Sequence, residues 1–395
     1  MRYYKFNVRD GYYIGETRQF SIYEKGMIRR DEPLERLQII PKINDKNHFN
    51  FQYGPATGGL IESLDFKIIT NGEAIKGIVV NPYVKSRTMR CLNKTIDECL
   101  LLVERINGYH AASHSIAFLS AVEDALNIDI AEGTYYGRIV ILELERIRSH
   151  LLVLKRMCEP AGFGVPMYQL SYINEIITRI ISDISGHRYF YSTNKLNRVD
   201  VDFGLLSSYI QTLIKIKREF ENIFNGLLES KIFINRLQGN GLIKDDPLIG
   251  PAARAAGFKR DARSNISILP YKELNFEPII FNEGDSFGRF YIRGLEISQS
   301  FDLCINALER AEQSEYNYSN NFSGEGAARL ESPSGDLFYY VNIDNGLIKD
   351  IQMSSPSYLN LKSFIKSAIN TIFTDFHFNF ESFGIWVSEV GVEFI

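Results

Sequence analysis

The residue types best suited to chemistry stand close together in the stretch VERINGYHAASHSIAFLSAVEDAL, which runs from Val103 to Leu126. Asn107 and His110 are separated by two residues, and His114 follows His110 at i+4, which places both imidazoles on one helix face. This spacing suits metal ligation. Because the stretch has neither an H-E-x-x-H glutamate nor an obvious third ligand, histidines that merely pack in a core or interface are the alternative.

A second polar group consists of Glu143, Arg146 and His150, spaced i, i+3 and i+7 on one face of an expected helix. These residues could form a buried acid–base relay. The alternative is a polar stripe that clasps a neighbouring helix, and we favour it because buried charges usually pair for structural reasons.

The segment LIGPAARAAGFKRDARSN, residues 248–265, is rich in glycine, proline and arginine and is predicted to be a loop. Arg254, Arg260 and Arg263, with Asp261 among them, could present guanidinium groups to an anion or a redox centre. The segment lacks the spacing of a phosphate-binding loop, and GEGAARLESPSG lacks a G-x-G-x-x-G after a strand. Neither a nucleotide site nor a Rossmann fold is expected.

Long amphipathic segments must position these groups. Helical periodicity covers residues 95–128, with a break near Asn107-Gly108, and residues 132–158, 169–185, 205–230, 288–312 and 358–373. Hairpins are predicted at Phe66–Val80, around Asn71-Gly72, and at residues 336–356, around Asn345-Gly346. The pattern predicts an α+β, mainly α fold, with a long-helix bundle and small β-sheets in the N- and C-terminal parts. We expect an N-terminal β-rich region at residues 1–85 and a helical core at residues 86–395, with a β-hairpin near 336–352.

The composition narrows the classes of protein. With 395 residues, 45% of them hydrophobic and 23% charged, the chain can bury one large core or two ordinary ones. A net charge of −4 does not indicate the positively charged surface that binds nucleic acid. The 4 cysteines form no C-x-x-C pair, which argues against a disulfide framework and a Cys-ligated site built by this chain alone. Without a signal-peptide pattern or an apolar run of about 18 residues, we expect a reduced-compartment protein that does not itself span a membrane.

Several motifs point to one family. ELERIRSHLLVL, GPAARAAGFKRDAR, GDSFGRFYIRGLEISQS and ESPSGDLFYYV with PSYLNL together resemble the large subunit of membrane-bound nickel–iron hydrogenases. They resemble equally its relative in respiratory complex I, the D-type subunit that forms the quinone site. The similarity runs from Tyr53 to Ile395, with the motifs in the family's order. The resemblance implies a long-helix bundle with small flanking sheets.

In the hydrogenase branch, the stretch around Asn107 resembles an R-x-C-G-x-C motif that gives two thiolates to a nickel–iron centre, and a C-x-x-C near the C-terminus gives two more. Asn107 and His110 occupy the first pair of positions here, and GIWVSEVGVEF, where the second pair should fall, has no cysteine. An amide and an imidazole do not replace four thiolates. We therefore expect no nickel–iron centre, no metal bound by this chain and no hydrogenase activity.

In the complex I branch, a loop histidine, a helix tyrosine and an aspartate hold the quinone headgroup, since Tyr and His can donate to its carbonyls. The matching positions are Thr57, Phe118 and Pro160, none of which is the family residue, with Glu159 as the alternative acid. The candidate acceptor cavity, for a quinone in altered geometry or another acceptor, is assigned to Thr57, Phe118, Asn107 and Arg254.

Other polar residues fall on motif positions of the family. Glu62 matches the glutamate that relays protons in the hydrogenase branch, and the further matches are Arg105, His114, Glu145, Arg146, His150, Arg254, Asp261 and Arg289. Their family roles are to orient the cavity, to contact the iron–sulfur subunit and to couple proton movement to the membrane arm. This retained shell suggests a reused cavity, and the alternative is that it only holds the fold together. The catalytic candidates are Glu62, His110, His114, Arg105 and His150.

The resemblance implies a peripheral protein on the cytoplasmic face of the cell membrane, within a complex I-like or energy-converting-hydrogenase-related oxidoreductase. The expected partners are an iron–sulfur subunit that carries the cluster, membrane-arm subunits and a protein like the C-type subunit of complex I, with no nucleic acid and no cofactor bound by this chain itself. The chain would help to form the terminal electron-acceptor cavity and couple electron transfer to ion translocation. A non-catalytic scaffold or coupling subunit, and a mononuclear metal at His110 and His114, are the alternatives.

Overall fold

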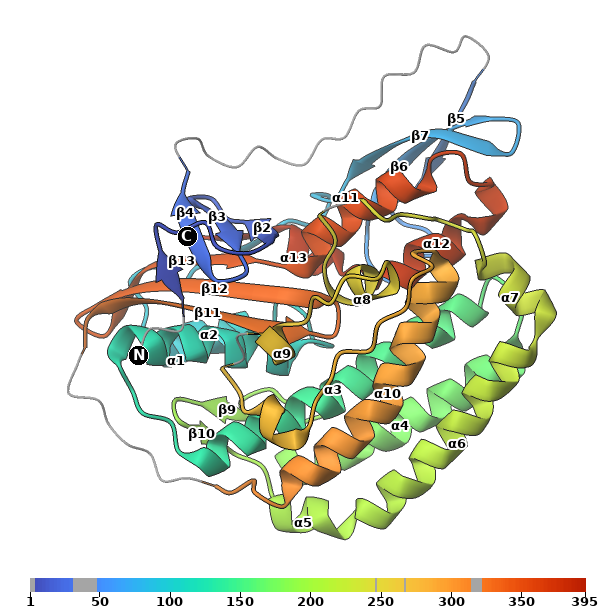
Figure 1. Ribbon diagram of the computed structural model, residues 1–395. Helices are drawn as coiled ribbons and strands as arrows, with labels where there is room; N and C mark the ends of the chain where they lie inside the picture. The colour runs from blue at the N-terminus through green and yellow to red at the C-terminus, as the bar shows by residue number, and fades with distance from the viewer. Residues whose placement is uncertain (1–3, 31–47, 246, 266–267, 314–321) are drawn as a thin grey trace.

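The computed structural model describes residues 4–30, 48–245, 247–265, 268–313 and 322–395 (Figure 1). Helices dominate it and several small sheets accompany them, so the expected α+β, mainly α fold class is confirmed. Within these described ranges, no helix has both the length and the apolar character that crossing a membrane requires.

The long helices form one bundle on one side of the molecule (Figure 1). Its members are α3 (Glu132–Cys158), α4 (Gly164–Ser185), α6 (Ile210–Glu229) and α10 (Ser286–Leu308). Helix α3 is central and packs against both α4 and α10, so the charged residues in its middle, from Arg138 to His150, are buried. Its bounds match the predicted segment, whereas the predicted fourth helix is divided at Tyr209 into α5 (Phe203–Ser208) and α6. Helix α7 (Lys231–Leu237) follows α6.

The predicted break near Asn107-Gly108 separates α1 (Ile96–Val103) from α2 (Ala111–Leu126). Helix α1 begins with a capping box, in which the Thr95 hydroxyl and the Glu98 carboxylate each satisfy a backbone N–H of the first turn. The turn that follows carries Asn107, and His110 directly precedes α2. Every residue of α2 is buried.

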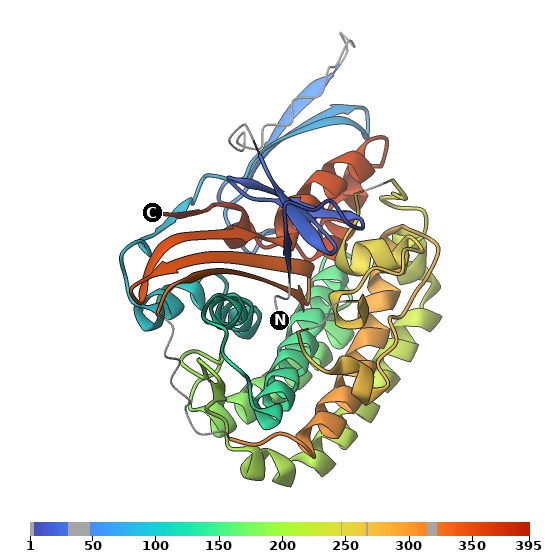
Figure 2. The same ribbon diagram turned by 60° about the vertical axis from the view of Figure 1, so that its left-hand side comes forward.

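A three-stranded antiparallel sheet covers α2. Its strands are β11 (Gly324–Ser332), β12 (Gly335–Asp344) and β13 (Leu347–Ser354). Helix α2 approaches so closely that a Cβ on Gly326 would lie 2.3 Å from the Ala121 carbonyl oxygen, so this position requires glycine. The opposite face supports the N-terminal sheet, made of β1 (Lys5–Phe6), β2 (Tyr13–Glu16), β3 (Phe20–Tyr23) and β4 (Gly26–Arg29) (Figure 2).

Two further sheets tie distant segments together. The sheet of β5 (Phe49–Tyr53), β6 (Asp65–Asn71) and β7 (Ala74–Asn81) packs through Phe66 on α11 (Pro356–Ala368) and α12 (Phe376–Phe383). Strand β14 (Val392–Phe394) pairs in parallel with β8 (Arg87–Met89), which brings the C-terminal segment and its short helix α13 (Val387–Val390) beside the stretch before α1. Strands β9 (Asn194–Lys195) and β10 (Arg198–Val199) form a small separate pair.

The prediction of a loop over residues 248–265 is wrong. The segment contains α8 (Gly250–Ala255) and α9 (Ala262–Asn265), and short 3-10 turns lie at Tyr271–Leu274 and Phe373–Asp375. Gly250 has a φ of +58°, and a proline follows it at the start of the helix, where a missing N–H costs nothing. The whole of α8 is buried, so packing stabilises a helix that is too short to be stable alone.

Candidate functional site

Three of the predicted residues converge on a carboxylate that the sequence did not single out, that of Glu389. Asn107 Nδ2 donates to Glu389 Oε1 at 2.8 Å, His110 Nδ1 lies 2.8 Å from the same oxygen, and His114 Nε2 lies 3.5 Å from it. The Ser357 hydroxyl donates to Oε2 at 2.7 Å. All five residues are buried. We call them the Glu389 cluster.

The charge of this cluster is set by its hydrogen bonds. Burial alone would raise the pKa of Glu389, but the hydrogen bonds from His110 and His114 outweigh burial and hold this pKa well below its usual range. The carboxylate is therefore ionised at neutral pH, next to two imidazoles that can each carry a proton. Proton storage and transfer between a carboxylate and imidazoles is the chemistry that this arrangement supports.

Each imidazole has a second partner, which orients its ring. His110 Nε2 lies 3.0 Å from Ser149 Oγ on α3, and His114 Nδ1 lies 2.8 Å from the Tyr339 hydroxyl on β12. Burial raises the pKa of Tyr339 well above its usual range, so this phenol is neutral. Both rings are thus held between Glu389 and a hydroxyl group.

The C-terminal segment places Glu389 by contacts on both sides of it. Glu62 accepts a hydrogen bond from the Ser388 backbone N–H at 3.0 Å, and the Trp386 backbone N–H donates to Ser357 Oγ at 3.1 Å. The Trp386 ring stacks on that of Tyr109, with centroids 5.2 Å apart. Glu62 therefore lies beside the cluster and contacts its backbone support.

Phe118 lies two turns beyond His110 on α2 and is fully buried. Its ring packs edge-on against Tyr339, with centroids 6.2 Å apart. Tyr339 thus brings a hydroxyl group from strand β12 to the neighbourhood of Phe118, the position that the resemblance matches to a helix tyrosine. This hydroxyl is already bound to His114.

His150 and Arg254 belong to a different group of charges, which meets at Glu296 of α10. His150 Nε2 lies 2.8 Å from Glu296 Oε2, and Arg254 Nε donates to Oε1 at 2.7 Å. Arg254 also pairs with Glu331 at 2.7 Å and Asp261 at 2.9 Å. Burial lowers the pKa of His150 to about 3, so its imidazole is neutral. Among the described residues, neither His150 nor Arg254 has a hydrogen bond or ion pair with the Glu389 cluster.

The polar stripe of α3 clasps its neighbours. Glu143 accepts hydrogen bonds at 2.6 Å from the hydroxyl groups of both Tyr271 and Ser300, and Arg146 donates to the carbonyl oxygen of Glu331 at 2.7 Å. These contacts join α3 to α10 and β11, so the polar stripe holds neighbouring elements together, as the favoured interpretation predicts.

Arg105 and Thr57 lie away from the cluster. The Arg105 side chain is 50% exposed, donates to Glu104 at 2.6 Å and stacks over the Tyr191 ring at 4.8 Å. Thr57 lies in the turn between β5 and β6, where its carbonyl accepts from the Leu60 N–H at 3.5 Å. The structure thus brings together Asn107, His110 and His114, with Glu62 and Phe118 nearby.

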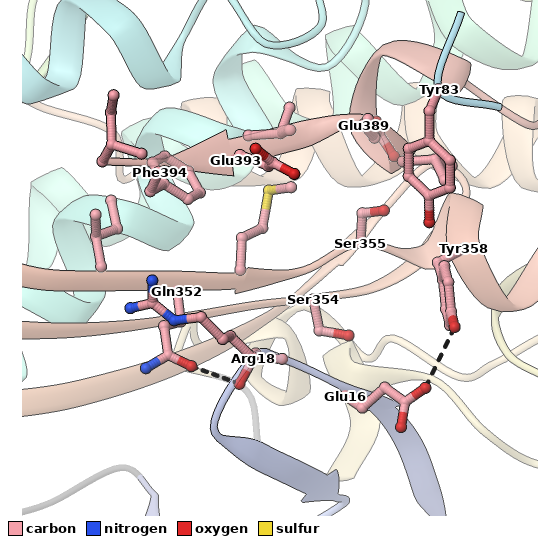
Figure 3. Close-up of a pocket in the computed structure, with 17 residues that line it drawn as sticks. Glu16, Arg18, Tyr83, Gln352, Ser354, Ser355, Tyr358, Glu389, Glu393 and Phe394 are labelled. Carbon is pink, nitrogen blue, oxygen red and sulfur yellow. Dashed lines mark hydrogen bonds between the residues drawn. The ribbon is translucent and has the colours of Figure 1, made fainter. Parts of the chain in front are cut away.

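A cavity of about 360 Å³ borders Glu389, and no residue of α2 lines it (Figure 3). The cavity is lined by residues from the end of β2, the turn after β7, strands β13 and β14 and the start of α11. Among them are Glu16, Tyr83, Met353, Ser355, Tyr358 and Glu393. None of the four residues predicted to form the acceptor cavity lines it.

The donor groups do not fit a nickel–iron centre. Asn107 and His110, which the resemblance matches to thiolate positions, present an amide and an imidazole to the Glu389 carboxylate, and the 4 cysteines are free and buried elsewhere. Across the described part of the chain, no group of three or more His, Cys, Asp or Glu side chains is arranged to hold a metal ion.

The sequence interpretation missed Glu389, although one signal was available. The resemblance assigns the second pair of metal-binding positions to the segment GIWVSEVGVEF, and this largely apolar segment carries two acids, Glu389 and Glu393. A buried acid needs partners, and Asn107 and His110, at the other pair of matched positions, are suitable ones.

Comparisons with known proteins agree with this fold. The model of the respiratory-chain NADH dehydrogenase 49 kDa subunit family matches residues 162–323. The alpha subunit of the membrane-bound hydrogenase of Pyrococcus furiosus is 26% identical over 80% of this chain and 81% of its own length. The D-type subunit of NADH-quinone oxidoreductase from Chlorobaculum parvum is 25% identical over 85% of this chain and 89% of its own length. The C/D-type subunit of the same enzyme from Phocaeicola vulgatus is 26% identical over 69% of this chain and 54% of its own length.

Among solved structures, the membrane-bound sulfane sulfur reductase, an archaeal respiratory membrane complex, contains a chain with the same fold. The two chains superpose with a TM-score of 0.81 at 19% sequence identity. The match covers 89% of this chain and all of the chain in that complex. The fold and the matches together show that this chain is similar to 49 kDa-type subunits of NADH dehydrogenase and to a membrane-bound hydrogenase subunit. The predicted resemblance is confirmed: the chain is similar both to D-type subunits of NADH-quinone oxidoreductase and to the alpha subunit of a membrane-bound hydrogenase, and it lacks the nickel–iron cysteines.

Proposed function

We propose that this chain handles protons for electron transfer in a complex I-like membrane complex, at a site where the Glu389 cluster has replaced the family's metal thiolates. The relatives support the coarser part, a subunit of a complex I-like or membrane-bound hydrogenase-type respiratory complex. The finer part rests on one observation, the buried carboxylate of Glu389 held between two imidazoles.

The electrostatics of a buried site give this proposal its mechanism. Reduction of an iron–sulfur cluster in a partner protein would add negative charge near a region of low dielectric constant. A nearby imidazole or carboxylate then binds a proton more tightly, because negative charge favours its protonated form. The Glu389 cluster has three groups that can share such a proton. Its uptake and release would then bias a membrane-arm partner.

The partners and the acceptor belong to the proposal. We propose an iron–sulfur subunit, membrane-arm subunits and a protein like the C-type subunit of complex I as partners at the cytoplasmic face, and NADH or ferredoxin as the source of electrons. A quinone in altered geometry or another acceptor receives the electrons, with no cofactor held by this chain itself.

The test uses the intact complex purified from membranes. Glu389→Gln and His110→Gln are each expected to lower electron-transfer turnover, by roughly 100-fold for groups that move a proton, while the set of assembled subunits stays unchanged. Glu62→Gln is expected to lower turnover less, because the Glu62 carboxylate contacts the Ser388 N–H and not Glu389 itself. The matched control is Glu277→Gln, since Glu277 is an exposed carboxylate paired with Lys259 at the surface. A preparation without an iron–sulfur subunit or a membrane-arm partner would contradict the proposal.

A non-catalytic coupling subunit is the second candidate. The charge network around Arg254 favours it, since three carboxylates pair with one guanidinium and tie α8, α10 and β11 into one rigid unit. Unchanged turnover in Glu389→Gln, His110→Gln and Glu62→Gln, with assembly intact, would select this candidate.

A further inference from the structure

The cavity in Figure 3 touches the Glu389 cluster at a single member. Asn107, His110 and His114 are at most 3% exposed, and none of them lines the cavity. Glu389 accepts hydrogen bonds from Asn107 and His110, lies 3.5 Å from His114 Nε2 and also forms part of the cavity wall. Any proton that moves between the cavity and the cluster therefore passes through Glu389.

The expected route through Glu62 reaches the cluster less directly. The Glu62 carboxylate accepts from the Ser388 N–H, so it contacts the backbone beside Glu389 and not the carboxylate itself. A backbone amide donates its hydrogen but does not pass protons on readily, since it has no low-energy deprotonated form. The cavity offers an approach that avoids this amide.

Several polar side chains line the cavity wall together with Glu389. Figure 3 shows Tyr83, Tyr358 and Ser355 on the same side as Glu389, with Glu16 beyond Tyr358. The Tyr358 hydroxyl donates to Glu16 at 3.3 Å. Each hydroxyl group can both accept and donate a hydrogen bond, as proton transfer along a chain requires.

The size and charge of the cavity suit water. A volume of about 360 Å³ can hold a small cluster of water molecules, each of which takes up about 30 Å³ in the liquid. The wall includes the carboxylates of Glu16 and Glu393, and its arginine, Arg18, is paired with Asp350 at 3.0 Å. Glu16 is itself paired with Arg30 and, at 3.5 Å, with Lys362, so the wall offers water hydrogen-bonding groups without a large excess of charge.

We propose that this cavity is the proton entrance to the Glu389 cluster, with Tyr358, Ser355 and water as the carriers. The inference rests on the proposed function, because a proton entrance has a use only where the cluster is protonated during turnover. The step moves one proton from cavity water to Glu389 or its imidazole partners, with no electron transferred and no covalent bond other than those to the proton made or broken.

The test places a removable plug in the cavity of the intact complex. Met353 lines the cavity, is partly exposed and has an apolar side chain, so Met353→Cys removes no ion pair. The 4 native cysteines of this chain are buried, so the new thiol is its accessible one. A bulky methanethiosulfonate reagent attaches there and is released by reduction. The control is Ile232→Cys on α7, at a side chain that is 75% exposed and far along the chain from the cavity wall.

Labelled Met353→Cys is expected to lose turnover by roughly 100-fold, as when proton transfer by a positioned group is removed, and to regain it on reduction. Its solvent deuterium isotope effect is expected to rise, because proton delivery becomes rate-limiting. Labelled Ile232→Cys and the labelled parent complex keep both values. Unchanged turnover, or a loss that appears only as a raised KM for the acceptor with no isotope effect, would overturn the inference. If Glu389→Gln also leaves turnover unchanged, the proposed function fails; if Glu389→Gln is inactive, only the entrance is wrong.

Discussion

Replacing Glu389 separates the structural role of this carboxylate from its chemical role. Glu389→Gln keeps the shape of the side chain and removes its charge, whereas Glu389→Ala removes both oxygens. In the glutamine variant the carbonyl oxygen can still accept from Asn107 and His110, and the Ser357 hydroxyl can turn to accept from the new amide. The two variants should therefore differ greatly in stability but not in activity.

The magnitudes follow from the contacts. Changing a charged acceptor into a neutral one weakens each of the three short hydrogen bonds by about 1 kcal/mol, and relief from burying a charge offsets much of this loss. The expected net cost of Glu389→Gln is about 1 kcal/mol. Glu389→Ala leaves three buried donors unpaired at about 1–3 kcal/mol each, so we expect a loss of about 3–6 kcal/mol.

Two assays are needed. Urea unfolding of the purified chain gives the free energies of unfolding, and turnover of the intact complex gives the activities. We expect both variants to lose turnover by roughly 100-fold, because neither can hold the proton. The reasoning is refuted if Glu389→Gln keeps normal turnover, or if it is as unstable as Glu389→Ala, which would make the charge a structural requirement only.

Three further predictions concern the rest of the molecule. Because burial holds the pKa of His150 at about 3, below its unfolded value of about 6.5, the stability that depends on its neutral form is present above pH 6.5 and is lost as the pH falls towards 3. Unfolding measured between pH 7 and pH 5 should show a slope of about 1.4 kcal/mol per pH unit below 6.5 that flattens in His150→Gln; equal slopes would contradict this. Arg254→Met should lower the free energy of unfolding by about 3–5 kcal/mol, since it leaves buried carboxylates unpaired. Arg236→Met breaks a half-exposed pair with Asp375 and should lower it by at most about 1 kcal/mol. Equal losses of unfolding free energy in the two variants would refute this prediction. Elemental analysis of the purified chain should find no stoichiometric nickel, because the donor groups are not thiolates, and one nickel per chain would show that this argument is wrong.

The long helices could be predicted from the sequence because their signal is local. The apolar spacing of residues 132–158 reproduces α3 at both ends, and Asn107-Gly108 marks the break before α2. The helix α8 was missed because its stability comes from packing, while its Gly-Pro start indicates a loop to any local rule.

The site could be predicted only in part, for a related reason. Asn107, His110 and His114 lie within two turns of chain, so their spacing alone brings them together. Their partner Glu389 is 279 residues beyond His110, and it arrives through the pairing of β14 with β8. Arg254 was expected to face a ligand, but its partners Glu296 and Glu331 come from α10 and β11, and tertiary packing decided this outcome.

Infrared difference spectroscopy of the intact complex, oxidised against reduced, tests the central claim most directly. If the Glu389 cluster takes up a proton when an electron arrives, the difference spectrum contains carboxyl and imidazole bands that disappear in Glu389→Gln, while the Glu277→Gln control keeps them. Superimposable spectra of the parent complex and Glu389→Gln, with both fully reduced, would contradict the claim.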